Sequence, residues 1–292
     1  MTIAPEAPTT LRFLSLEITT RCQLTCPSHC YAQAGPTRGH GSMTGQDWHR
    51  LIDEAVALGT TTVQLIGGEP TQHPDFTALV EHALQVGLRV RVYSNLVRIR
   101  QAHWRLFEHP RLSLATSYHS DDPDEHDMIT GLRGSHTATR ANLVEAVRRG
   151  IPVKVAIVDL GGGQRVEQAR AEMQALGVHQ IHVDAVRAVG NAATVRAVLP
   201  STSALCGRCG DKKAAILPDG DVSVCEIGRF LTAGSVKSAS LASVLASDRW
   251  TQIAASVPRH TSADPCPPDC APNDDSACGP DNPGPCGPAD DE

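Results

Sequence analysis

The feature that most constrains how this chain folds is a regular alternation of strand-like and helix-like segments between residues 11 and 186. Six apolar segments of strand length recur along it, at 11–18, 61–66, 88–93, 111–117, 152–158 and 180–186. Amphipathic segments of helix length lie between them, near 44–58, 74–86, 98–108, 136–149 and 164–176. Strict alternation is typical of a parallel sheet covered by helices. Because eight units close a full barrel, six units predict an α/β fold with a partial (β/α)6 TIM-like barrel.

Local signals mark the ends of the first two helices. Thr44, with Asp47 three residues later, forms a capping-box pattern at the start of the first helix, and Gly59 follows its end. Pro74 suits the first turn of the second helix, which Gly87 closes. The expected buried stripes contain Trp48, Leu51, Ile52, Ala55 and Val56 in the first helix, and Phe76, Leu79, Val80, Ala83 and Leu84 in the second.

The character of the sequence changes after residue 200. Cys206 and Cys209 precede two short apolar runs joined by Asp219-Gly220, which predicts a β-hairpin, and a helix is expected near 239–255. The stretch that follows is rich in Pro, Asp and Gly and lacks periodicity, so it has almost nothing to bury. We therefore predict two domains, a partial barrel over residues 11–200 and a small cysteine-rich domain over residues 201–292.

The composition limits the class of protein. The 292 residues have a net charge of −6, and residues 264–292 contain eight acids and no Lys or Arg. The other residues carry 26 bases and 24 acids, so no basic surface for nucleic acid is expected. No apolar run approaches the ~18 residues of a membrane span, and the first ten residues lack the pattern of a secretory signal. We expect a cytoplasmic protein with neither nucleic acid nor membrane as a partner.

Cysteine usage gives the first indication of function. Ten cysteines are many for a cytosolic chain, in which disulfides are rare, so metal or cluster ligation explains them better. Cys22, Cys26 and Cys30 follow the first strand, with three residues in each gap. Three thiolates on one loop can hold three irons of a cubane cluster and leave the fourth iron open, whereas structural zinc takes four ligands. The alternatives are a zinc site that borrows a fourth ligand, such as His29, or three core thiols.

A Gly-Gly-Glu-Pro turn, made of Gly67, Gly68, Glu69 and Pro70, follows the second predicted strand. Ligands of α/β barrels bind at this carboxyl end of the strands. Glycines there would let a ligand approach the backbone, and Glu69 would accept an ammonium group. The alternative is a turn that serves the fold and binds nothing.

The cysteine loop and this turn together resemble the radical S-adenosylmethionine (SAM) superfamily, over residues 11–192. The resemblance implies that the three loop cysteines hold a 4Fe-4S cluster and that the turn binds the amino group of SAM. Most members have two residues in the second gap of the loop, where this chain has Pro27-Ser28-His29. The stretches HSDDPDEHDMITGLRGSH and VRAVGNA, after the fourth and sixth strands, are similar to the peptide-modifying branch of the superfamily.

The same resemblance implies further SAM contacts. Ser94 and Asn95 would lie by the ribose, Ser117 and Arg133 near the carboxylate, and Val189 by the adenine. The alternative for Ser94 and Asn95 is a turn that ends a strand, and for Arg133 it is a solvated loop charge.

The C-terminal cysteines resemble a second iron-sulfur domain. Cys206, Cys209, Gly220 and Cys225 match the opening of the SPASM or twitch-like extension, which implies an auxiliary iron-sulfur cluster. The later signature of that domain has gaps of two, five and three residues, whereas this chain has gaps of three, seven and seven. The cysteines concerned are Cys266, Cys270, Cys278 and Cys286. The pattern leaves open whether the domain holds one auxiliary cluster or two. The alternative is a tail that is stabilised by zinc.

Polar side chains at the predicted strand ends are candidates for the reaction space, because such positions face the ligand in barrels. They are Glu17, Tyr118, His119, Asp159, Asp184 and Arg187. Each could instead pack or form a salt bridge. Tyr118 and His119 are the candidate catalytic residues, as proton or substrate contacts.

The resemblance implies that the protein is an enzyme, a radical SAM oxidoreductase. A flavodoxin- or ferredoxin-type donor would reduce the cluster, and SAM would be cleaved to methionine and a 5′-deoxyadenosyl radical that takes a hydrogen atom from the substrate. The expected substrate is a ribosomally made precursor peptide in natural-product biosynthesis, which is modified or cross-linked. Because the predicted barrel begins by residue 11, we expect a separate leader-binding protein, or recognition by the barrel and tail.

Two alternative functions stay open at this point. One is a radical SAM dehydrogenase of a small alcohol such as an aminocyclitol. The other is a non-catalytic iron-sulfur or zinc scaffold, which would bind metal without turning over SAM.

Overall fold

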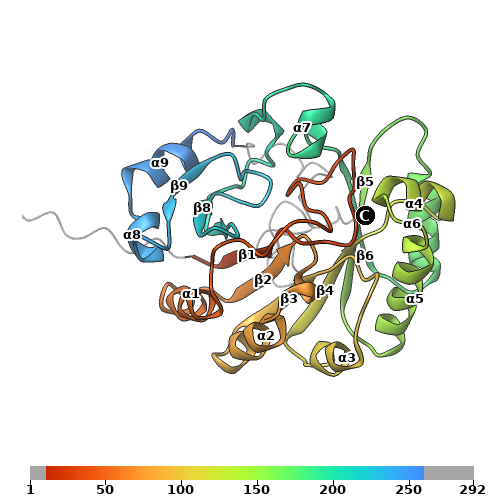
Figure 1. The fold of residues 1–292 in the computed structure, drawn as a ribbon, viewed down its shortest axis with the longest axis horizontal. Coiled ribbons are helices and arrows are strands. Elements are labelled where there is room, and N and C mark those ends of the chain that lie inside the picture. The colour runs from red at the N-terminus through yellow and green to blue at the C-terminus, as the bar shows by residue number, and fades with distance from the viewer. Residues whose placement is uncertain (1–10, 260–292) are drawn as a thin grey trace, which may run out of the picture.

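The computed structural model describes residues 11–259, and its centre is one curved sheet of nine strands in the order β6-β5-β4-β3-β2-β1-β7-β8-β9 (Figure 1). The strands are β1 Phe13–Thr19, β2 Thr62–Gly67, β3 Arg89–Tyr93, β4 Leu112–Ser117, β5 Val153–Asp159, β6 Gln180–Ala185, β7 Lys213–Ile216, β8 Asp221–Ser223 and β9 Thr232–Ser235.

The first six strands are parallel and neighbour each other in chain order. At least one helix connects each pair, as the alternation predicts. Within residues 11–259, β6 and β9 form the two edges of the sheet, and no pairing joins them. The sheet is therefore an open, partial barrel, which confirms the predicted fold class.

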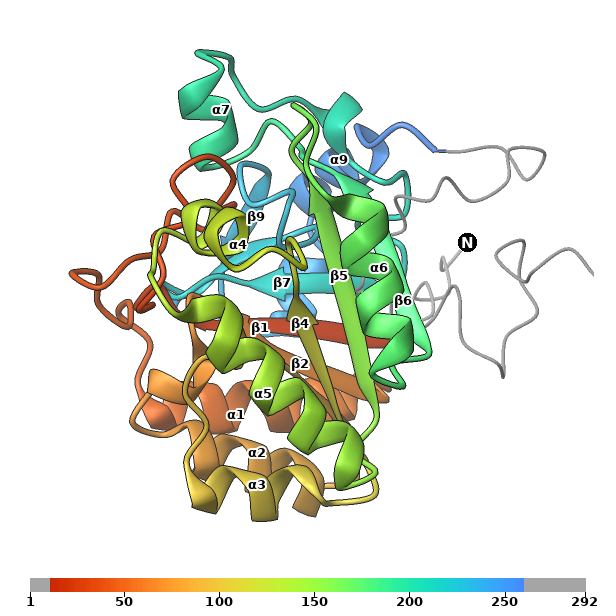
Figure 2. The same cartoon turned by 90° about the vertical axis from the view of Figure 1, so that its right-hand side faces the viewer.

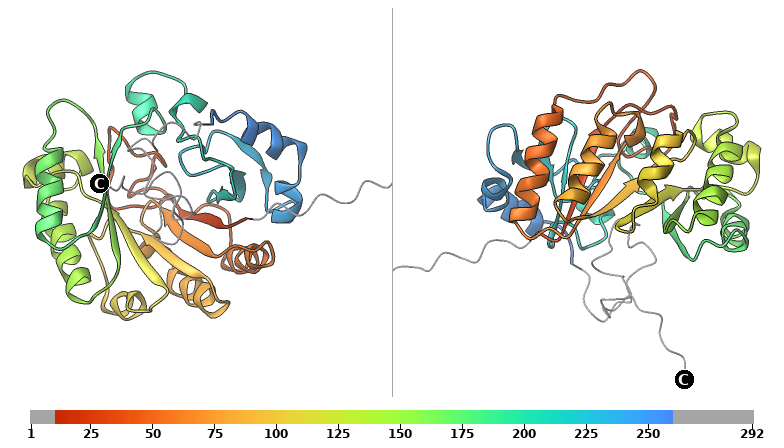
Figure 3. Two further views of the ribbon diagram at one scale, coloured as in Figure 1. Left: turned by 180° about the vertical axis from the view of Figure 1, so that it is seen from behind. Right: turned by 90° about the horizontal axis from the view of Figure 1, so that it is seen from below.

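The helices that connect the parallel strands, α1 to α3, α5 and α6, lie on the outer side of the curved sheet (Figures 2 and 3). Helices α1 to α3 cover the half that contains β1 to β3, whereas α5 and α6 cover β4 to β6 (Figure 2). The α-helices are α1 Gly45–Ala57, α2 Phe76–Gln85, α3 Gln101–Phe107, α4 Pro123–Thr130, α5 Ser135–Arg148, α6 Val166–Ala175, α7 Asn191–Val195, α8 Leu241–Leu245 and α9 Asp248–Ala255; two short 3-10 turns are η1 Pro70–Gln72 and η2 Thr202–Ala204.

The first two helices show why the sequence pattern was informative. The capping box of α1 is present, since the Thr44 hydroxyl accepts from the amide of Asp47 and the Asp47 carboxylate accepts from the amide of Thr44. The expected stripes of α1 and α2 are buried, except that Val56 is 38% exposed. Pro74 precedes α2 by two residues and does not lie in its first turn, because η1 and a further turn occupy the connection.

The C-terminal part continues the same sheet. Strand β7 pairs with β1 in parallel, on the side of β1 opposite to β2. Strands β7 and β8 form the predicted antiparallel hairpin, with Asp219-Gly220 in its turn, and β9 extends it. The first strand of the barrel is consequently covered on both edges, and its seven residues are all buried. The predicted domain boundary at residue 200 stays a prediction.

Several elements differ from the sequence predictions. The single helix expected over 239–255 is wrong: α8 ends at Leu245, and Ser247 caps a new helix, α9, by accepting from the amide of Trp250. Helices α4 and α7 and strand β9 were not predicted, because they are short and carry no long apolar stripe. None of the helices in residues 11–259 combines the length and apolar character that a bilayer crossing requires.

Candidate functional site

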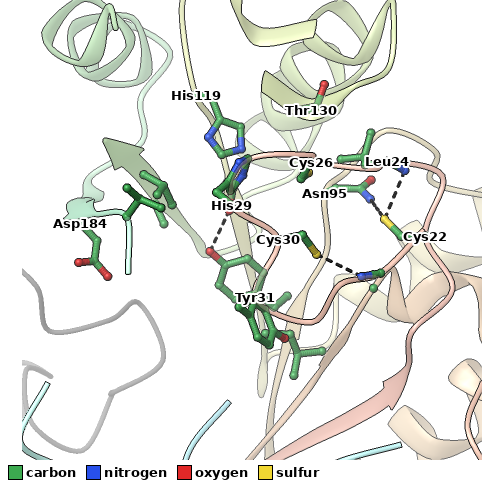
Figure 4. Close-up of a pocket in the computed structure, with 18 of the residues that line it drawn as sticks. Cys22, Leu24, Cys26, His29, Cys30, Tyr31, Asn95, His119, Thr130 and Asp184 are labelled. Carbon is green, nitrogen blue, oxygen red and sulfur yellow. Dashed lines mark hydrogen bonds between the residues drawn. The ribbon is translucent and has the colours of Figure 1, made fainter. Parts of the chain in front are cut away.

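A cavity lies at the carboxyl ends of the parallel strands, where the barrel fold predicts a ligand (Figure 4). All three cysteines of the loop after β1 line this cavity, and so do both glycines of the turn after β2. Four more strands each contribute a residue from near their carboxyl end: Tyr93, Ser117, Val158 and Asp184. These residues are far apart in the sequence. The parallel sheet brings them together because the carboxyl ends of all its strands lie at the same edge.

Two short helices hold the cysteine loop in place. The amide of Cys26 donates to the carbonyl of Thr130, at the end of α4, over 3.0 Å. The amide of Asn191, at the start of α7, donates to the carbonyl of Cys30 over 2.9 Å. Cys26 itself has a positive φ of 38°, a conformation that non-glycine residues adopt rarely. The unpredicted helices α4 and α7 therefore fix the loop conformation.

The loop sulfurs are free thiols, and two of them accept hydrogen bonds from nearby N–H groups. Cys22 Sγ accepts from the amide of Leu24 at 3.4 Å and from the side-chain amide of Asn95 at 3.5 Å, and Cys30 Sγ accepts from the amide of Ala34 at 3.3 Å (Figure 4). Burial raises the pKa of Cys22 to about 12 and also raises the pKa of the other two thiols. Without a metal, the raised pKa values favour the protonated thiols. A bound metal cation reverses this preference, because coordination deprotonates a thiol.

The glycines of the turn have a clear steric requirement. A Cβ at Gly67 would lie 2.2 Å from the carbonyl oxygen of Thr19, and one at Gly68 would lie 2.3 Å from that of Arg21. The amide of Gly68 donates to the Thr19 carbonyl over 2.7 Å. The turn thus packs backbone to backbone against the start of the cysteine loop, and this contact explains both glycines without the ligand approach that the sequence suggested.

Glu69 is buried and ties the turn to the end of β3. Its carboxylate accepts from the hydroxyls of Thr71 and Ser94 at 2.7 and 2.9 Å, and from the amides of Asn95 and Thr71 at 2.8 and 3.1 Å. Pro70 begins η1 directly afterwards. Burial raises the pKa of this carboxyl although the hydrogen bonds oppose the shift. A role for Glu69 with an ammonium group stays a prediction.

The other predicted SAM contacts fall into two groups. Asn95, Ser117 and Val189 line the cavity, and the Ser117 hydroxyl lies 3.1 Å from that of Tyr93. Ser94 is buried, is absent from the cavity lining and donates to Glu69. Arg133 is exposed and is not part of the lining, so its position favours the solvated loop charge.

The two predicted catalytic residues lie in different surroundings. His119 lines the cavity, and its Nδ1 is buried without a hydrogen-bond partner. The Tyr118 hydroxyl lies 2.7 Å from Nε2 of His136 and donates to Glu172 at 2.6 Å, on helices α5 and α6. Tyr118 is absent from the cavity lining, and burial raises the pKa of its hydroxyl. This position favours a structural role for Tyr118 over the predicted substrate contact.

Histidines gather on the α4 side of the cavity, which the sequence analysis did not predict. The rings of His29 and His119 are 4.8 Å apart, and that of His126 lies 5.5 Å from His119. Burial lowers the pKa of His29 and of His126 to about 4, so both are neutral near pH 7. The signal that would have found His126 is the helix start at Asp122-Pro123, an N-cap followed by proline.

Polar residues at the strand ends form ion pairs. Glu17, fully buried at the end of β1, binds Arg229 at 2.9 Å. Asp184 and Arg187 pair at 3.2 Å, and both line the cavity. Asp159 accepts from the amide of Gly161 and shapes the turn after β5. The salt-bridge alternative thus describes three of these predicted positions.

A second group of cysteines flanks the β7–β8 hairpin. Cys206 and Cys209 precede β7, and Cys225 follows β8. Their sulfurs are close, with 3.9 Å between Cys206 and Cys209 and 2.9 Å between Cys209 and Cys225. Arg229, four residues after Cys225, lies over the ring of Tyr31 and binds Glu17. One side chain therefore connects this module to the first cysteine loop.

The remaining predicted ligands, Cys266, Cys270, Cys278 and Cys286, lie outside the described residues. Within residues 11–259 no three His, Cys, Asp or Glu side chains are grouped as ligands of a single metal ion. Thiolates that hold a multi-iron cluster are spread over its corners and do not converge on one point.

Comparison with known families identifies the superfamily to which the chain belongs. The model of the radical SAM superfamily matches residues 16–176, more than half of the chain, so the protein belongs to the radical SAM superfamily. A second model, the SPASM iron-sulfur cluster-binding domain, matches residues 206–271. These two families imply 4Fe-4S clusters together with SAM, as the cysteine patterns suggested.

Curated relatives include several PqqA peptide cyclases. That of Ruegeria pomeroyi is 32% identical over 206 residues, which are 67% of this chain and 53% of the relative. That of Streptomyces rochei is 32% identical over 148 residues, or 49% of this chain and 39% of the relative. The chain thus spans about half the length of the curated relatives it matches, or less.

Solved structures with the same fold include SuiB of Streptococcus suis bound to S-adenosylmethionine, with a TM-score of 0.70 and 16% identity over 84% of this chain and 68% of SuiB. Another is anSMEcpe with bound AdoMet, with a TM-score of 0.66 and 11% identity over 83% of this chain and 82% of that one. Because these sequence identities are low, the structural similarity shows that the fold is shared and no more.

The residues of the cavity fit a cluster-bound cofactor. Three free thiols on one loop face a common cavity, N–H groups point at two of the sulfurs, and the third thiol lies on a residue held at positive φ. Such donor sets suit iron-sulfur clusters, which are held by thiolates and tuned by hydrogen bonds to sulfur.

Proposed function

We propose that this protein is a radical SAM enzyme that modifies a ribosomally made precursor peptide. The observation that carries the proposal is the cavity at the strand ends, in which three thiols of one loop lie beside the Gly-Gly turn. A cluster with SAM bound to its open iron supplies a hydrogen-abstracting radical. The protein supplies the placement of the substrate C–H bond and the exclusion of water.

In this proposal Cys22, Cys26 and Cys30 hold the cluster. Helices α4 and α7 keep the loop in one conformation through their bonds to its backbone. The side-chain amide of Asn95 supports the thiolate of Cys22 with a hydrogen bond, which stabilises negative charge on sulfur.

SAM would occupy the rest of the cavity. Gly67 and Gly68 form its floor at the end of β2, and Asn95, Ser117 and Val189 line it further on. Glu69, Pro70 and Ser94 would act from behind by holding the turn and the end of β3. Arg133 is exposed and outside this lining, so we assign it no contact with SAM.

A peptide is the substrate class that the relatives favour over a small alcohol. The matched relatives are named PqqA peptide cyclases, and SuiB has been solved bound to the precursor peptide SuiA. We assign His119 as the candidate catalytic residue, because its unpartnered Nδ1 is buried at the cavity wall and its ring contacts His29. Oxidation of the peptide would make the enzyme an oxidoreductase.

An auxiliary cluster would use Cys206, Cys209 and Cys225, with further ligands from the four tail cysteines. Oxidative cross-linking removes two hydrogens from a peptide; the first leaves as an atom, and the second leaves as a proton and an electron. An auxiliary cluster near the cavity would accept that electron. We further propose a flavodoxin- or ferredoxin-type donor, a separate leader-binding protein and a cytoplasmic location.

The test is conversion of a peptide. The reconstituted protein, SAM and a reductant would be incubated anaerobically with short peptides encoded beside its gene, and the products analysed by mass spectrometry. The proposal expects one peptide to lose hydrogen in step with SAM cleavage. In the Cys225→Ala variant, SAM cleavage should continue while peptide conversion stops. Cleavage of SAM that converts only a small alcohol would refute the peptide assignment.

A further inference from the structure

A second hollow lies beside the cysteine loop and shares Cys22 with the central cavity. Cys22 lines both spaces and so forms part of the wall between them. Three arginines border the outer hollow: Arg21 on the cysteine loop, and Arg98 and Arg100 on the segment between β3 and α3. A positively charged rim therefore lies directly outside a proposed cluster ligand.

The three arginines at the rim form no ion pair in the part of the chain that the structure describes. All three side chains are exposed. Glu69 is the acid among the residues that line the hollow, and its carboxylate is buried and bonded to Thr71, Ser94 and Asn95. Within the described residues, no ion pair therefore neutralises the positive charge at the rim.

The patch extends beyond the rim. Arg38 and Arg133 are also exposed, and they lie two residues and one residue along the chain from the lining residues Pro36 and Leu132. Some exposed arginines elsewhere pair with acids, for example Arg50 with Glu54 and Arg165 with Asp121, whereas others, such as Arg89, do not. We call Arg21, Arg38, Arg98, Arg100 and Arg133 the arginine patch.

Concentration of one charge sign on a small surface steers partners of the opposite sign. Outside the acidic tail, the chain has nearly equal numbers of bases and acids, so the patch is a local feature and not a consequence of net charge. A partner that docks here would be separated from the central cavity by the wall that contains Cys22.

We propose that the arginine patch docks an acidic one-electron carrier protein, which reduces the cluster through the Cys22 wall. The inference rests on the proposed function and names the partner of the same site. The carrier loses one electron and the cluster gains it; no bond is made or broken at the surface, and the carrier dissociates oxidised.

The test compares two double variants with the same change in charge. Arg98→Glu with Arg100→Glu reverses the patch beside Cys22. The control, Arg89→Glu with Arg170→Glu, changes two exposed arginines at the start of β3 and on α6 that form no ion pair within the described residues. A flavodoxin is the probe, and its Kd for each reconstituted protein is measured at low and at high salt.

The patch variant should bind flavodoxin about tenfold or more weakly at low salt, while the control stays close to wild type. The difference should shrink at high salt, because screening weakens exposed charges. Arg38→Glu, on a different loop, should weaken binding in the same direction. SAM cleavage driven by dithionite, which needs no docking, should be unchanged in the patch variant.

Equal Kd values for the patch and control variants would overturn the docking proposal. That result is distinct from failure of the proposed function, in which wild-type protein with bound cluster would cleave no SAM even with dithionite. A patch variant that also loses dithionite-driven cleavage would likewise overturn the proposal, because the arginines would then act on the site itself.

Discussion

Gly68 illustrates how a single residue couples the two motifs of the site. Its lack of a side chain lets the turn after β2 lie against the carbonyl of Arg21, one residue before the first loop cysteine. The sequence indicated that a glycine belonged there, but not which contact required it. The reason is that the contacting segments are separated by more than forty residues, and only the folded chain brings them together.

The first prediction concerns this contact. Gly68→Ala should lower the free energy of unfolding by about 1–3 kcal/mol, as overpacking in a closely packed region does, because the new methyl group would meet backbone that cannot rotate away. Gly39→Ala is the matched control, since its Cβ would have no neighbour within 4 Å. Chemical denaturation under anaerobic conditions measures both; equal stabilities would contradict the account.

A second prediction concerns the buried carboxyl of Glu17. Burial raises its pKa from 4.5 to about 7, although Arg229 lowers it; Glu226 nearby raises it. Between pH 4.5 and 7 the folded chain then holds more protons at this site than the unfolded chain, so the free energy of unfolding falls as pH rises through that window. The titration of Glu17 changes the free energy of unfolding by about 3 kcal/mol at most.

Glu17→Gln removes this titration. Denaturation curves across the window should therefore show a shallower loss of stability with rising pH in the variant than in the wild type. Parallel pH profiles for the two proteins would mean that Glu17 titrates at its ordinary pKa.

Elements of strong periodicity were predictable, and short elements were not. Strands β1 to β6 and helices α1 and α2 have continuous apolar patterns or complete stripes, so local sequence identified them. Helices α4 and α7 are short, and tertiary contacts to the cysteine loop specify their position. The cavity residues that α4 contributes, His126 and Thr130, reach the cavity through this packing, which the helix-start signal at Asp122-Pro123 does not encode.

The third prediction tests α4 as an element. Asp122 caps it, with its carboxylate accepting from the amide of Glu125 at 2.9 Å. Asp122→Ala should destabilise the protein by about 1 kcal/mol, the usual value of an N-cap. Asp124→Ala, which removes an exposed acid of the same first turn without a capping bond, should cost only a few tenths of a kcal/mol. Thermal denaturation distinguishes the two; the reverse order would contradict the cap.

At the scale of the whole molecule, the C-terminal module is part of the barrel sheet. Strand β7 pairs with β1, so the segment that holds the second cysteine group lies against the strand that leads into the first. The cysteine patterns predicted both groups, but spacing could not show that they share a sheet or that Arg229 joins them through Glu17. Long-range β pairing depends on the fold as a whole.

This arrangement gives the two cysteine groups different expected roles. The first lies in the cavity with the Gly-Gly turn, whereas Cys206, Cys209 and Cys225 are outside that lining. Loss of the first group should therefore stop the chemistry at its first step.

The assignment of the first cysteine group as the site of SAM cleavage is tested most directly by one measurement. It is the formation of 5′-deoxyadenosine by anaerobically reconstituted protein given SAM and dithionite. The wild type should form it, and the variant with Cys22, Cys26 and Cys30 all replaced by alanine should form none while still folding, as judged by circular dichroism. Formation of 5′-deoxyadenosine by the folded triple variant would contradict the assignment of the cysteine loop as the site of SAM cleavage.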